Sequence, residues 1–71
     1  MDRDVHTRYL RYREAFAYFA KPGLPGGDKQ LEPAAFEKAD AEQVVLEKKG
    51  AARTDEEEAR FVELTMLLFR D

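Results

Sequence analysis

Residues 54–70 read TDEEEARFVELTMLLFR, and this stretch decides the fold class of the chain. Thr54 is a suitable helix N-cap, because its hydroxyl can accept a hydrogen bond from a free amide of the first turn. Glu57 follows three residues later, so the pair matches the reciprocal capping box. The carboxylates of residues 55–58 suit the positive end of the helix dipole. We therefore predict a helix over residues 55–70.

The apolar residues of this helix recur every three or four positions, which is the spacing of a helix with one buried face. That face consists of Phe61, Leu64, Thr65 and Leu68, and is widened by Val62 and Phe69. We expect Phe61 to be central in the core. Met66 and Leu67 project to either side of the face, so they are either covered by neighbouring helices or exposed to a partner.

The first part of the chain predicts a helix over residues 4–20. Its apolar residues are spaced as in a coiled-coil seam: Val5, Tyr9, Tyr12, Phe16 and Phe19. Pro22 disfavours a helical conformation in the residue before it, and so ends this helix. Residues 22–30 contain two prolines and three glycines, which predicts an irregular connection.

A second helix is predicted over residues 33–49, with a proline at its first position and Gly50 as its C-cap. Its apolar stripe is weak, with Phe36 and Gln43 at the edge; the stripe consists of Leu31, Ala35, Ala39 and Leu46. The link over residues 51–53 is short, so this helix and the last one are expected to form an antiparallel hairpin.

These elements predict one all-α domain over residues 1–71, a small three-helix bundle. A chain this short has a marginal stability, about 3–5 kcal/mol, and it has no cysteine with which to form a disulfide. No apolar run approaches the roughly 20 residues that span a bilayer. We expect no membrane contact and a cytoplasmic protein.

The sequence offers little for catalysis, so we predict a protein that is not an enzyme. It contains no serine or cysteine nucleophile, and His6 is its only histidine. A metal site needs more donors at fixed geometry, so no metal or cofactor is expected. The glycine-rich connection does not match a phosphate-binding loop, since Asp28 stands where its second glycine belongs.

Charge is divided unevenly along the chain. Residues 1–21 carry a net charge of +2 and residues 54–71 a net charge of −4, within a total of −3. The opposite charges can attract each other within one chain or between two copies, and they can steer a protein partner. The basic part also allows nucleic-acid binding as an alternative, with the candidates Arg3, Arg8, Arg11 and Arg13. Because the chain as a whole is acidic, nucleic acid is a less favoured partner than a protein.

We therefore predict a small protein–protein interaction module: an adaptor, a regulatory subunit or a homo-oligomer. Its partner is expected to be another protein or a second copy of the chain. The candidate contact residues are Arg11, Tyr18, Val44, Met66 and Leu67.

Overall fold

The computed structural model describes residues 1–24 and 26–70, so Pro25 of the predicted connection and Asp71 lie outside the described residues. Within these ranges the chain forms three α-helices, one short 3-10 helix and no strand. The elements are α1 (Arg3–Phe19), α2 (Pro33–Lys49), η1 (Gly50–Ala52) and α3 (Asp55–Leu67). None of these helices is long and apolar enough to cross a membrane.

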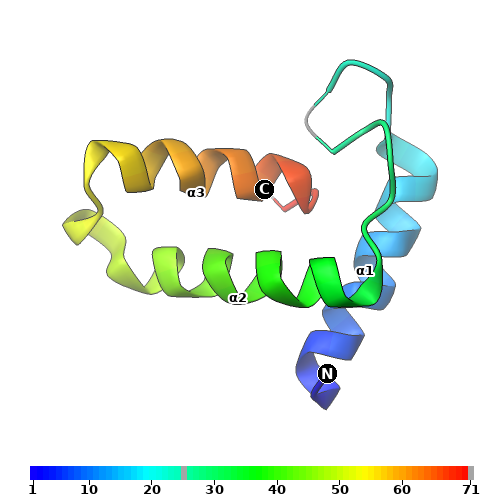
Figure 1. The fold of residues 1–71 in the computed structure, drawn as a ribbon, viewed down its shortest axis with the longest axis horizontal. Coiled ribbons are helices and arrows are strands. Elements are labelled where there is room, and N and C mark those ends of the chain that lie inside the picture. The colour runs from blue at the N-terminus through cyan, green and yellow to red at the C-terminus, as the bar shows by residue number, and fades with distance from the viewer. Residues whose placement is uncertain (25, 71) are drawn as a thin grey trace.

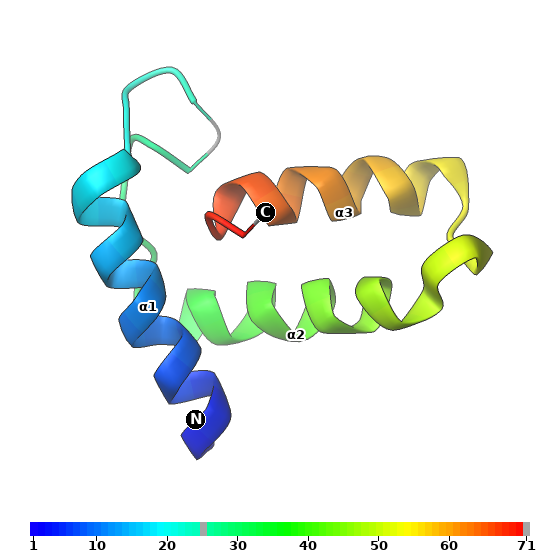
Figure 2. The ribbon, with the colours of Figure 1, turned by 180° about the vertical axis from the view of Figure 1, so that it is seen from behind.

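The predicted three-helix bundle is confirmed, and its hairpin is the more regular part. α2 and α3 lie side by side and run antiparallel, while α1 lies across the open end of the hairpin (Figure 1). Figure 2 shows the same arrangement from behind. α1 packs against α2 of its own chain, since the ring centroids of Tyr9 and Phe36 are 5.1 Å apart.

The start of α3 is the capping box that the sequence predicts. The amide of Glu57 donates to the Thr54 hydroxyl at 3.2 Å, and the Thr54 amide donates to the Glu57 carboxylate at 3.1 Å. Arg53, just before the cap, pairs with Glu58 at 2.5 Å. The two hydrogen bonds of the capping box satisfy amides that a helix start otherwise leaves without partners.

The end of α3 differs from the prediction, because the helix stops at Leu67 and not at residue 70. The amide of Phe69 donates to the carbonyl of Met66 at 3.2 Å, and the amide of Arg70 donates to that of Thr65 at 2.8 Å. This pair of hydrogen bonds is a Schellman motif, which ends a helix by turning the chain. The turn places Arg70 back over α2 instead of on the last turn of α3.

Phe69 occupies the position of this turn where glycine is usual, with a φ of 54°. A left-handed conformation costs a residue with a side chain roughly 1–2 kcal/mol. The ring offsets this cost, because it packs on α1 at centroid distances of 5.9 Å from Tyr12 and 6.1 Å from Phe16. The strained residue thus closes the hairpin against α1.

Phe36 is the centre of the core, although the sequence placed it at the edge of a weak stripe. Its side chain is 0% exposed, and the ring of Tyr12 lies 5.3 Å from its own. The buried apolar residues are Tyr9, Tyr12, Phe36, Leu46, Leu64 and Leu68. The expected stripe holds in part, because Leu46 is buried and Leu31 and Ala39 pack against the core, whereas Ala35 is exposed. The buried face of α2 also includes two polar residues, Asp40 and Gln43.

Two aromatic residues that were predicted to be core are not. Phe61 is only half-buried, and its ring lies under the guanidinium of Arg53, at 4.1 Å from the ring centroid, and outside the core cluster. Phe19, in the last turn of α1, is 65% exposed. Val62, expected to widen the buried face of α3, is also exposed.

The connection after α1 is irregular, as predicted, and it is fixed at two points. The amide of Leu31 donates to the hydroxyl of Tyr12 at 2.8 Å. Gly26 packs so closely on α3 that a Cβ atom there would lie 2.6 Å from Cδ1 of Leu67 and 2.9 Å from its carbonyl oxygen. Leu67 is therefore half-buried under the connection.

We predict that Phe36→Ala removes about 3–5 kcal/mol of unfolding free energy, because it leaves a cavity in the centre of the core. That is comparable with the whole stability expected of so small a domain, so the helical circular dichroism signal should collapse. Phe61→Ala is the matched control and should cost clearly less. If urea unfolding showed that Phe36→Ala and Phe61→Ala lose the same free energy of unfolding, Phe36 would not be the centre of the core.

A second prediction concerns the fit of the connection on α3. Gly26 and Gly23 both have a positive φ, at 72° and 91°, but nothing lies within 4 Å of a Cβ at Gly23. Both Gly→Ala variants should lose about 1 kcal/mol to backbone strain. Gly26→Ala should lose a further 1–3 kcal/mol, roughly, to the clash with Leu67. Matching melting temperatures for the two variants would contradict this packing.

Candidate functional site

An ionic cluster joins all three helical segments near the open end of the hairpin. Asp40, in the middle of α2, is only 2% exposed. Arg8 of α1 binds it with both ends of the guanidinium fork, from Nε to Oδ1 at 2.8 Å and from Nη2 to Oδ2 at 2.8 Å. Arg70 donates to Oδ1 of Asp40, and to the amide oxygen of the buried Gln43 at 2.9 Å.

This cluster keeps its carboxylate ionised. Burial by itself raises the pKa of Asp40, but the hydrogen bonds and charges of Arg8 and Arg70 outweigh it and hold that pKa below its ordinary value. The hydrogen bond to Asp40 in turn raises the pKa of Arg8. Within the described residues, no buried polar side-chain atom lacks a hydrogen-bond partner. A carboxylate that is paired in this way holds the fold and is not available as an acid or base.

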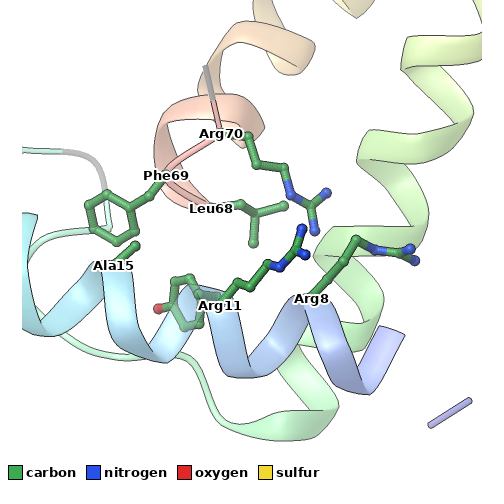
Figure 3. Close-up of a pocket in the computed structure, with 7 residues that line it drawn as sticks. Arg8, Arg11, Ala15, Leu68, Phe69 and Arg70 are labelled. Carbon is green, nitrogen blue, oxygen red and sulfur yellow. The ribbon is translucent and has the colours of Figure 1, made fainter. Parts of the chain in front are cut away.

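A pocket with a volume of about 170 Å³ opens beside the cluster, between α1 and the turn after α3 (Figure 3). Three arginines surround it: Arg8, Arg11 and Arg70. The remaining lining is aromatic or aliphatic, and consists of Tyr12, Ala15, Leu68 and Phe69. The pocket therefore combines cationic groups with an apolar wall.

The predicted contact residues do not gather on one surface. Arg11 and Tyr18 are exposed and lie seven residues apart, which places them on the same side of α1. Met66 is exposed on α3, on the side away from the core. Val44 is half-buried in a second cavity with Val5 and Ala41, and Leu67 is half-buried under the connection. Only the two residues on α1 share a face.

The four arginines proposed for nucleic-acid contact are also separated. Arg8 is bound to Asp40, while Arg3, Arg11 and Arg13 are exposed. At 3.6 residues per turn, Arg11 and Arg13 point in directions about 200° apart around α1. They do not form a single basic stripe along the helix.

The sequence reasoning missed Asp40, Gln43 and the role of Arg70. A sequence pattern could have predicted these buried polar residues. The pattern is a set of four residues at helical spacing: Phe36, Asp40, Gln43 and Leu46. Two polar residues within such a stripe indicate a buried polar network as well as a weak helix face. Within the described residues, no group of three or more acidic or histidine side chains is placed to hold a metal ion.

Comparison of the chain with protein-family models, with curated proteins and with solved structures finds no match in any of the three.

We predict that Asp40→Asn lowers the unfolding free energy by about 3 kcal/mol, because it leaves two arginines without their carboxylate. This cost is at the lower end of the range for breaking a buried ion pair, because the side chains of both arginines are partly exposed to solvent. Urea unfolding at pH 7 measures it. Glu56→Gln, at an exposed carboxylate, is the matched control and should change the free energy by less than about 0.5 kcal/mol.

The acid dependence of stability follows from the lowered pKa of Asp40. A carboxylate whose folded pKa lies below its unfolded value, about 3.9, stabilises the fold fully above that value. The contribution is lost as the pH falls through the folded pKa, because the unfolded chain then binds more protons. The wild-type chain should therefore lose stability more steeply below about pH 4 than Asp40→Asn does. Parallel acid curves would contradict the ion pairing.

Proposed function

We propose that the protein is a small interaction module without catalytic activity, and that it binds another protein through one face of α1. This α1 face consists of Arg11, Ala15, Tyr18 and Phe19. The main supporting observation is the exposure of its two aromatic residues, since Tyr18 is 76% and Phe19 is 65% exposed. Their ring centroids lie 6.4 Å apart, so they present one joint aromatic surface.

The spacing of these residues makes the face continuous. Arg11, Ala15 and Tyr18 stand at positions i, i+4 and i+7, which project on the same side of a helix. Arg11 and Ala15 also line the arginine pocket, so the aromatic pair extends that pocket along α1. Leu24 adds an exposed apolar residue beside the end of α1, where its amide donates to the carbonyl of Lys21.

The chemistry of the α1 face suits a protein partner. Aromatic and arginine side chains are enriched in protein interfaces, where they supply most of the binding energy. The acidic first turn of α3, with exposed Asp55 and Glu56, offers charge complementary to Arg11 if the partner is a second copy. The proposal covers that homo-oligomer and also a role as adaptor or regulatory subunit of a different protein. It includes a cytoplasmic location, which suits a chain without cysteine.

Nucleic-acid binding remains a prediction from the sequence, and the geometry does not favour it. The basic residues of α1 point in different directions, and Arg8 is already bound to Asp40. Of the three tyrosines among these basic residues that could stack on bases, Tyr9 and Tyr12 are buried in the core and Tyr18 alone is exposed.

We predict that sedimentation equilibrium over a wide concentration range detects a discrete oligomer, and that Tyr18→Ser with Phe19→Ser abolishes it. The double variant should keep its helical circular dichroism signal, because both side chains lie outside the core. Val45→Ser is the matched control, since Val45 is exposed on the separate helix α2 and should not affect association. An oligomer that survives the double variant would place the interface elsewhere.

If the protein is a monomer at every concentration, the proposed partner is a different protein, and this possibility is tested separately. A photo-reactive phenylalanine analogue placed at Tyr18 in the native cell should form a discrete protein adduct, whereas the same group at Val45 should not. The Tyr18 adduct should disappear when Phe19→Ser is added. The proposed function would be refuted if the protein is a monomer and the photo-reactive group at Tyr18 also forms no protein adduct.

A further inference from the structure

The arginine pocket has an excess of hydrogen-bond donors. Each guanidinium carries five N–H donors. Arg8 uses two of them on Asp40, and Arg70 uses one on Asp40 and one on Gln43. Within the described part of the chain, the guanidinium of Arg11 makes no hydrogen bond or ion pair with another residue. Several donors of three guanidinium groups therefore remain for a further acceptor.

The pocket also has an excess of positive charge. Three guanidinium groups line it, and within the described residues Asp40 is the one carboxylate bound to any of them. Asp40 itself is buried beneath the arginines, so it fixes Arg8 and Arg70 in place without neutralising Arg11. Figure 3 shows the guanidinium groups of Arg11, from α1, and Arg70, from the turn after α3, close to each other, while the Arg8 side chain extends to one side of them, where it binds Asp40. An anion at this point would meet Arg8 and Arg70, which Asp40 already holds in place, and the exposed guanidinium of Arg11.

The wall of the pocket limits which anion fits. Tyr12, Ala15, Leu68 and Phe69 give it an apolar surface, against which a bare, strongly hydrated phosphate gains nothing. The volume of about 170 Å³ is similar to that of cavities, about 150 Å³, that hold a benzene ring. The pocket is thus suited to a planar carboxylate, which matches the guanidinium fork, carried on a small apolar body.

We propose that the pocket between α1 and the turn after α3 binds a carboxylate attached to an aromatic or aliphatic group. The carboxylate would lie against Arg11 and the free donors of its two neighbours, and the apolar body against Leu68 and Phe69. The same chemistry can come from a free small acid, or from an acidic residue next to an aromatic residue in a protein. This site goes beyond the proposed function, because it holds whether or not the α1 face binds a protein.

The test is a titration of the isotopically labelled chain followed by amide chemical shifts. Benzoate should produce saturable shifts at Ala15, Leu68 and Arg70, while the neutral analogue benzamide and inorganic phosphate should bind at least about tenfold more weakly. Arg11→Gln should weaken benzoate binding about tenfold, the loss of one charge-assisted contact. Arg13→Gln removes an equal charge from another side of α1 and should have little effect.

Equal affinities for benzoate and benzamide, unchanged binding in Arg11→Gln, or no saturable shifts at all would overturn the proposal. A capped dipeptide, acetyl-Phe-Asp-amide, distinguishes the two sources, because tighter binding than benzoate indicates a carboxylate carried by a protein. The Tyr18→Ser, Phe19→Ser variant should still bind benzoate, since neither residue lines the pocket. If this double variant no longer self-associates but still binds benzoate, the carboxylate site and the proposed protein-binding face are independent of each other.

Discussion

The contact on which the rest of the structure depends is the buried carboxylate of Asp40 between Arg8 and Arg70. It joins the middle of α2 to α1 and to the turn that follows α3. Burying ions is costly, and well-packed apolar residues often stabilise a fold as much as a buried ion pair does. We infer that this cluster mainly fixes orientation, because apolar contacts alone are non-directional and would permit α1 to lie against the hairpin at several angles.

The turn after α3 is the second element of this arrangement. Phe69 adopts a left-handed conformation that is unfavourable for a phenylalanine, and its ring packs on α1. The same turn directs Arg70 towards Asp40 and Gln43. The backbone strain at one residue is thereby compensated by aromatic packing on one side and charged hydrogen bonds on the other, within a single turn of chain.

The position of α1 explains both functional proposals. Because α1 crosses the hairpin instead of lying along it, the hairpin covers the middle of α1, where Tyr9 and Tyr12 are buried. Tyr18 and Phe19, near the end of α1, remain exposed. The crossing also leaves the arginine pocket open between α1 and the C-terminal turn. The exposed aromatic residues and the cationic pocket are thus consequences of one packing geometry.

Local spacing, capping residues and short links act over a few residues, so they are enough to predict the three helices, the capping box at Thr54 and the antiparallel hairpin. It also placed Arg11 and Tyr18 among the candidate contact residues. Three features became visible in the folded chain alone. Phe36, and not Phe61, lies at the centre of the core; the carboxylate of Asp40 is buried; and Arg8 and Arg70 both bind that carboxylate. These features depend on contacts between residues 24 to 32 positions apart in the sequence, and on the angle at which α1 crosses the hairpin. Neither is encoded in local periodicity.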